Sequence, residues 1–75
     1  MVIAFILATT KTGKEKEVLN NLMVNREIKE AYNVYGDYDI FIKAEVADLE
    51  MLNEFLVKKI RTAPNIVMTT TMIGL

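Results

Sequence analysis

Apolar and polar residues follow strand-like patterns in four parts of the chain. Residues 2–9 are continuously apolar or β-branched, a run too short for a buried helix and typical of a strand that is covered on both faces. Residues 27–35 and 38–46 alternate between apolar and polar positions. Residues 66–73 are rich in β-branched side chains, which favour strands. These patterns predict four strands.

Two further segments have helical spacing. We expect the first helix to begin with a capping box, in which Thr12 and Glu15 each accept the other's backbone N–H, and to run to about Val24. The second is expected to begin at Asp48 and to end before Pro64. The inward stripe of the first helix comprises Val18, Leu19, Leu22 and Met23. That of the second comprises Leu49, Leu52, Phe55, Leu56 and Ile60.

The pair Gly36-Asp37 lies between the two alternating segments. Glycine adopts positive φ without steric cost, so this pair suits a two-residue type II′ hairpin turn. In the segment before the turn, strict alternation places Ile28, Glu30 and Tyr32 on one face.

The order of elements predicts an α+β, ferredoxin-like βαββαβ fold for residues 1–75 as one domain. Both helices should cover the same face of a four-stranded antiparallel sheet. The first strand has apolar residues on both sides, with Ile3, Phe5 and Leu7 on one face and Val2, Ala4 and Ile6 on the other. In the last strand, alternation groups Ile66, Met68 and Met72 on one face, opposite Val67 and Ile73.

Two helices leave one apolar face of this sheet uncovered, which soluble monomers rarely tolerate. We therefore expect a twofold dimer in which the uncovered faces of two chains pack together. The small size of the chain favours the same conclusion, because short domains usually need a disulfide, a metal or a partner subunit.

Composition excludes several classes of function. The chain lacks cysteine, histidine and serine, so disulfides, thiolate metal sites and the common nucleophile–base pairs are impossible. We expect no catalytic residue, no metal and no cofactor. The net charge of −1 provides no electrostatic footprint for nucleic acid.

Residues 2–8 form the longest apolar run, far below the ~20 residues that span a bilayer, and lack the flanks of a signal peptide. We expect a soluble, cytoplasmic protein without membrane contact.

Three polar features are open to two interpretations. Asp37 and Asp39 are either a functional carboxylate pair or solvated acids at a turn. The threonines at 69–71 either reflect strand propensity or present hydroxyls near an oligomer surface. The tyrosines near the turn, at 32, 35 and 38, anchor either packing within the chain or an interface, since a phenol combines apolar area with a polar tip.

Residues 31–43, AYNVYGDYDIFIK, resemble the hairpin signature of the ligand-sensing RAM domain of the Lrp/AsnC transcriptional regulators. Residues 67–73, VMTTTMI, are similar to the closing strand of that domain, and the resemblance covers essentially the whole chain. Full-length members begin with a helix-turn-helix domain, whereas this chain begins directly on its first strand. It therefore resembles a stand-alone RAM module, for which we expect no direct contact with DNA.

The resemblance implies a homodimer that assembles further, either with copies of itself or with full-length regulators. It also implies that a free amino acid binds where dimers meet. Carried over by position, Asp39 would accept the ligand's ammonium, and threonines of a neighbouring chain would complete the site. The candidate ligand-binding residues are Tyr35, Gly36, Asp37, Tyr38, Asp39, Thr69 and Thr71.

Two other functions fit the sequence less well. A small dimeric α+β barrel enzyme, of the monooxygenase or isomerase type, shares the topology but needs an acid–base residue in an enclosed cavity. An RNA-binding sheet needs exposed aromatic residues with basic neighbours, whereas the expected central strands carry Glu30, Asp39 and Glu45. The sequence favours an amino-acid-binding module over both.

Overall fold

The computed structural model describes all residues from Met1 to Leu75. Its strands are β1 (Val2–Thr10), β2 (Ile28–Asn33), β3 (Ile40–Val46) and β4 (Ile66–Ile73). The helical elements are α1 (Glu15–Leu22), α2 (Leu49–Phe55) and a π-helical turn, η1 (Leu56–Ile60). The chain order confirms the predicted βαββαβ arrangement.

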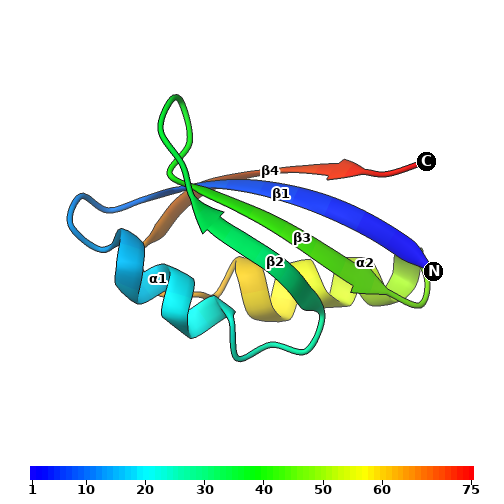
Figure 1. Ribbon diagram of the computed structural model, residues 1–75. Helices are drawn as coiled ribbons and strands as arrows, with labels where there is room; N and C mark the ends of the chain where they lie inside the picture. Colours follow the sequence, from blue (N-terminus) through cyan, green and yellow to red (C-terminus); the bar gives the residue numbers. More distant parts are fainter.

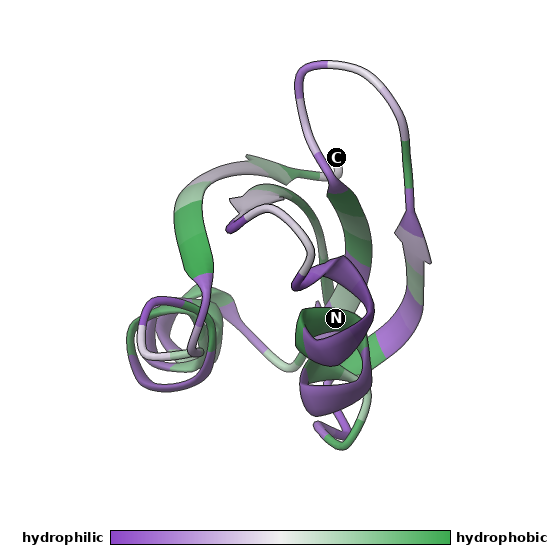
Figure 2. Cartoon of the chain, turned by 90° about the vertical axis from the view of Figure 1, so that its left-hand side faces the viewer, coloured by the Kyte–Doolittle hydropathy of each residue, from purple (hydrophilic) through white to green (hydrophobic).

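The strands form one antiparallel sheet in the order β2-β3-β1-β4. Both helices lie beneath this sheet, and its upper face carries no element except the β2–β3 loop, which rises above it (Figure 1). Seen from the end, the sheet curves over the two helices (Figure 2). These observations confirm the α+β, ferredoxin-like fold with both helices on one face.

The core lies between the sheet and the helices. Alternate strand residues are buried there, including Ala4, Ile6 and Ala8 of β1, which have no solvent exposure. From the helical side the buried residues are Val18, Leu22, Leu52, Phe55 and Ile60. No helix is both long and apolar enough to cross a membrane.

The first helix begins differently from the prediction. Gly13 adopts a φ of +85°, and the helix follows Lys14 as its N-cap without any side-chain cap. Glu15 Oε1 accepts the backbone N–H of Gly13 at 3.2 Å, not that of Thr12. The capping box is therefore wrong, because the left-handed turn at Gly13 separates Thr12 from the helix. The helix also ends at Leu22, two residues before the predicted Val24, and Met23 is half exposed.

Two bulges change the predicted faces of the outer strands. In β2 the register shifts between Ile28 and Glu30, so Ile28 joins the core while Glu30 and Tyr32 lie on the opposite face. In β4 the register shifts at Val67, so Ile66 packs against the core, away from the face of Met68 and Met72. The predicted groupings were wrong because each bulge adds one residue and reverses the alternation on one side of it.

The second helix begins where predicted. Asp48 accepts the backbone N–H of Met51 at 2.8 Å and caps α2. Leu49 is 59% exposed, however, so the inward stripe starts at Leu52. The helix then widens into η1, where the N–H of Arg61 bonds to the carbonyl of Leu56, five residues earlier.

Candidate functional site

The connection between β2 and β3 is a loop formed by residues 34–39, not a two-residue turn. It is closed by a hydrogen bond from the Val34 N–H to the Asp39 carbonyl at 2.8 Å. Gly36 has the predicted positive φ, +125°. The predicted two-residue turn is wrong because pairing between β2 and β3 ends at Asn33–Ile40 and the Val34–Asp39 bond. Residues 35–38 lie outside this pairing, and the Tyr38 hydroxyl bonds to β4 instead.

Asp39 is fixed against the end of β1. Its backbone N–H donates to the carbonyl of Ala8 at 2.9 Å. Its carboxylate Oδ2 accepts the backbone N–H of Thr10 at 2.8 Å, and the Thr10 hydroxyl lies 3.4 Å away. The other oxygen, Oδ1, has no hydrogen-bond partner within the chain. The half-buried carboxylate therefore keeps one oxygen available to accept a hydrogen bond.

A hollow of about 370 Å³ lies between the start of α1 and this loop. It brings two acids, Glu15 and Asp39, together with the cation of Lys16. The hollow is lined by Glu15, Lys16, Asn33, Val34, Tyr35 and Asp39. Such a lining offers acceptors for an ammonium group and a positive charge for a carboxylate. Sequence reasoning missed Glu15, Lys16 and Asn33, because nothing in their spacing shows that α1 begins beside the loop.

Tyr38 points away from this hollow. Its hydroxyl lies 3.0 Å from the Oγ1 of Thr70 on β4, although Tyr38 precedes β3 and β1 runs between the two strands. Thr70 pairs with Leu7, whose side chain is on the uncovered side of the sheet. The phenol of Tyr38 therefore lies over β1 on that side.

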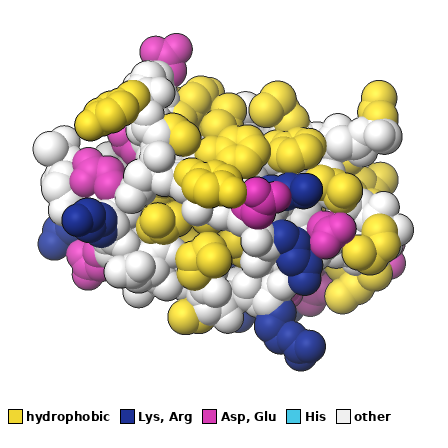
Figure 3. Space-filling model, viewed as in Figure 1, with side chains coloured by type: hydrophobic (Ala, Val, Ile, Leu, Met, Phe, Trp, Pro, Cys, Tyr) yellow, Lys and Arg dark blue, Asp and Glu magenta, His cyan; other side chains and the backbone are white.

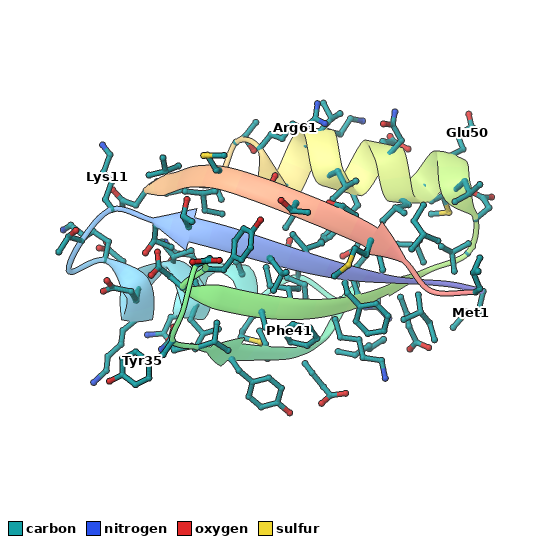
Figure 4. All side chains as sticks on the ribbon, turned by 90° about the horizontal axis from the view of Figure 1, so that it is seen from above. Met1, Lys11, Tyr35, Phe41, Glu50 and Arg61 are labelled. Atoms are coloured by element: carbon teal, nitrogen blue, oxygen red, sulfur yellow. The ribbon has the colours of Figure 1, made fainter.

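The other predicted site residues occupy two separate places. Tyr35, Gly36 and Asp37 form the exposed tip of the loop, and Tyr35 projects beyond the sheet (Figure 4). Thr69 and Thr71 are half-buried and pair with Ala8 and Ile6, so their side chains are on the helix side of β4. One chain thus brings Tyr35 and Asp39 together in the hollow, while the two threonines do not line it. The contribution of Thr69 and Thr71 from a neighbouring chain stays a prediction.

The uncovered side of the sheet, called the open face below, is rich in large side chains. Figure 3 shows hydrophobic side chains gathered along the upper part of the molecule, above the sheet. Phe41, near the middle of this face (Figure 4), stacks with Phe5 at 6.0 Å and with Tyr32 at 6.4 Å between ring centroids. The open face comprises Ile3, Phe5, Leu7, Thr9, Glu30, Tyr32, Phe41, Lys43, Glu45, Met68, Thr70 and Met72.

A polar cluster lies at the β2 edge of the open face. The Tyr32 hydroxyl donates to Glu30 Oε1 at 2.7 Å, and Lys43 Nζ lies 3.5 Å from Glu30 Oε2. The hydrogen bond from Tyr32 and, secondly, the charge of Lys43 lower the pKa of Glu30 from its usual 4.5. The same hydrogen bond raises the pKa of Tyr32 above its usual 10.0. Both oxygens of Glu30 are thus engaged within the chain.

Comparison with known proteins relates this chain to transcriptional regulators. The HTH-type transcriptional regulator FL11 of Pyrococcus abyssi is 43% identical over 74 residues, which are 99% of this chain and 48% of that protein. The chain thus spans about half the length of the curated relatives that it matches. These relatives are named as regulators and not as enzymes, which agrees with the expected absence of catalysis.

Solved structures show the same fold. The crystal structure of FFRP-DM1 is 51% identical and has a TM-score of 0.97 over the full length of both chains. Escherichia coli AsnC is 35% identical, with a TM-score of 0.93 over 99% of this chain and 50% of that one. A transcriptional regulator from Neisseria meningitidis, solved in complex with L-Met, has a TM-score of 0.88 at 14% identity, covering 99% of this chain and 49% of its own.

The family model described as the Lrp/AsnC ligand binding domain matches residues 3–75. With nearly the whole chain matched, and with fold and relatives in agreement, this protein belongs to the Lrp/AsnC ligand-binding domain family.

Proposed function

We propose that this chain is an amino-acid-binding effector module of the Lrp/AsnC type, which modulates transcription or amino-acid metabolism in the cytoplasm. The observation that carries the proposal is the carboxylate of Asp39, fixed by Thr10 through one oxygen and free at the other beside an open hollow. Membership of a ligand-binding domain family supports it.

The chemistry of the hollow matches the two charged ends of a free amino acid. The ligand's ammonium donates to Oδ1 of Asp39, a charge-assisted bond roughly twice as strong as a neutral one. The ligand's carboxylate lies toward Lys16 or toward backbone N–H groups at Gly36, where no side chain prevents a close approach. Tyr35 and Val34 would contact the ligand's side chain.

Assembly through the open face is the second part of the proposal. A second copy of the chain is its occupant, because the face carries three stacked aromatic rings and because Met68 and Met72 are 65% and 49% exposed. Two of the three charged groups there, Glu30 and Lys43, already pair with each other, and the third is Glu45. The resulting dimers associate further, alone or with full-length regulators of the family, and Thr69 and Thr71 of a neighbouring chain complete the site. The module itself does not bind nucleic acid.

A thermal-shift screen with each of the twenty amino acids tests the ligand. A ligand at 100 times its dissociation constant stabilises a protein by about 2.7 kcal/mol, so a binder raises the melting temperature measurably. Methionine belongs in the screen because the Neisseria meningitidis regulator was solved with L-Met. A flat response to all twenty would overturn the proposal.

The variant Asp39→Asn tests the site itself. The amide keeps the shape of the carboxylate and an oxygen for the Thr10 N–H, but it removes the charge that attracts the ammonium. Loss of a hydrogen bond to a charged group costs about 1.5–3 kcal/mol, so calorimetry should show affinity weaker by about tenfold or more. Glu50→Gln, an exposed acid on α2, serves as the matched control and should bind as the parent does. Unchanged affinity in Asp39→Asn would remove Asp39 from the site.

A further inference from the structure

Two consecutive residues at the end of the β2–β3 loop are bonded to two different strands. The carboxylate of Asp39 is held by Thr10 at the end of β1 and lines the hollow. The hydroxyl of Tyr38 bonds to Thr70 on β4, on the open face. One peptide unit therefore connects the candidate ligand site with the surface proposed to meet a second copy.

The rest of the loop has no comparable attachment. The side chains of Tyr35 and Asp37 make no hydrogen bond, and a Cβ added to Gly36 would meet nothing within 4 Å. The position of the loop is therefore determined by the backbone bonds of Asp39 to Val34 and Ala8 and by the side chains of Tyr38 and Asp39.

A second copy on the open face necessarily meets the phenol of Tyr38. To reach Thr70, that phenol crosses β1 near Leu7, within the same apolar surface as Phe5 and Phe41. Packing against this surface therefore covers the Tyr38–Thr70 contact and changes its surroundings. A change at Tyr38 is passed directly to Asp39, the next residue, and to the loop tip.

We propose that the Tyr38–Thr70 hydrogen bond couples the β2–β3 loop to the open face, so that dimerisation and ligand binding each alter the free energy of the other. The ligand half of this inference rests on the proposed function, whereas the link between loop and face does not. Because coupling free energies are reciprocal, the ligand changes the dimer dissociation constant by the same factor as dimerisation changes ligand affinity.

The variant Thr70→Val tests the coupling without touching the hollow. Valine keeps the β-branched shape that suits a strand but removes the hydroxyl that bonds Tyr38. The matched control, Tyr32→Phe, removes a hydroxyl from the same face that bonds Glu30 instead of the loop. For each protein, the amide NMR signal of Gly36 is followed through a dilution series, with the mass in solution measured by light scattering.

In the parent and in Tyr32→Phe, the Gly36 signal should move in step with the fraction of dimer. In Thr70→Val this shift should be lost while dimers still form. A Gly36 signal that stays fixed as the parent dimerises would overturn the inference, and so would an unchanged shift in Thr70→Val. A chain that remains a single subunit throughout would overturn both this inference and the assembly part of the proposed function.

A second series adds an equimolar mixture of the twenty amino acids. The mixture should change the parent's dimer dissociation constant by about fivefold or more, the lower range of typical coupling, and this change should be lost in Thr70→Val. If the mixture neither binds nor alters the dimer while the Gly36 signal still follows dimerisation, the amino-acid function fails and the link between loop and face stands.

Discussion

The two faces of the sheet are built from alternate residues of the same strands, yet they differ in the size of their side chains. On the face covered by the helices, β1 and β3 contribute Ala4, Ala8 and Ala44 among aliphatic neighbours, and no strand residue there is aromatic. The open face carries Phe5 and Phe41, beside the methionines of β4. Small residues let the helices approach closely, whereas bulky ones project from a surface that no helix of the chain covers (Figure 1).

This difference separates two kinds of stability. Side chains on the covered face stabilise the single subunit, because they exchange water for helix contacts during folding. Side chains on the open face are half-buried or exposed within one chain, and their accessible apolar area is available for association. Substitutions on the two faces should therefore respond differently to protein concentration.

The largest effect is expected from Ile6→Ala on the covered face. Ile6 is fully buried in the main core, and removing such a side chain costs about 2–5 kcal/mol through lost burial and a residual cavity. Denaturant unfolding should show this loss at every protein concentration. The neighbour Leu7→Ala, on the open face, is the matched control and should cost much less under conditions where the chain is dissociated. Equal losses in the two variants at high dilution would contradict the comparison.

A smaller effect, confined to association, is expected from Phe41→Ala. Phe41 contacts both other rings of the open face, and a buried aromatic anchor at an interface is typically worth about 2 kcal/mol. The dimer dissociation constant, measured by light scattering on dilution, should rise about thirtyfold, since 1.4 kcal/mol corresponds to a factor of ten. Val57→Ala, on an exposed part of η1, should leave association unchanged. Undiminished dimerisation in Phe41→Ala would show that this face is not the interface.

The smallest effect concerns the polar cluster at the β2 edge of the open face. The pKa of Glu30 is lowered in the folded chain, so its stabilising contribution is present above pH 4.5 and is lost as the pH falls through the folded pKa. The pKa of Tyr32 is raised in the folded chain. Its contribution to stability is therefore present below pH 10.0 and is lost as the pH rises through the folded pKa of Tyr32. Melting temperatures of Glu30→Gln should lack the acidic part of this dependence. A profile identical to the parent's would show that the cluster contributes nothing to stability.

Much of the fold could be predicted from periodicity. The element order, the covered residues of β1 and the Asp48 cap follow from local patterns that tertiary structure leaves intact. Three failures lie where one residue is added or one backbone angle reverses, at Val67, beside Ile28 and at Gly13. A fourth is the β2–β3 turn, which is longer than two residues because Tyr38 bonds to the distant Thr70. A bulge leaves the composition of a strand unchanged, so alternation alone could not reveal it.

The candidate site was predictable only in part. The resemblance pointed to Asp39, and the structure gives that carboxylate one occupied and one free oxygen. The neighbours that complete the hollow, Glu15 and Lys16, come from a helix more than ten residues away in the chain, and only the folded structure brings them to the loop. The bond between Tyr38 and Thr70 spans 32 residues and likewise had no local signal.

The single π turn at residues 56–60 has a consequence for changes in chain length. It inserts one residue between Phe55 and Ile60, yet both side chains still reach the core. Deleting exposed Val57 would restore the four-residue spacing of an ordinary α-helix and keep the two side chains on one face. We therefore expect this turn to be where relatives differ by a one-residue insertion or deletion, and the shortened chain should still unfold cooperatively.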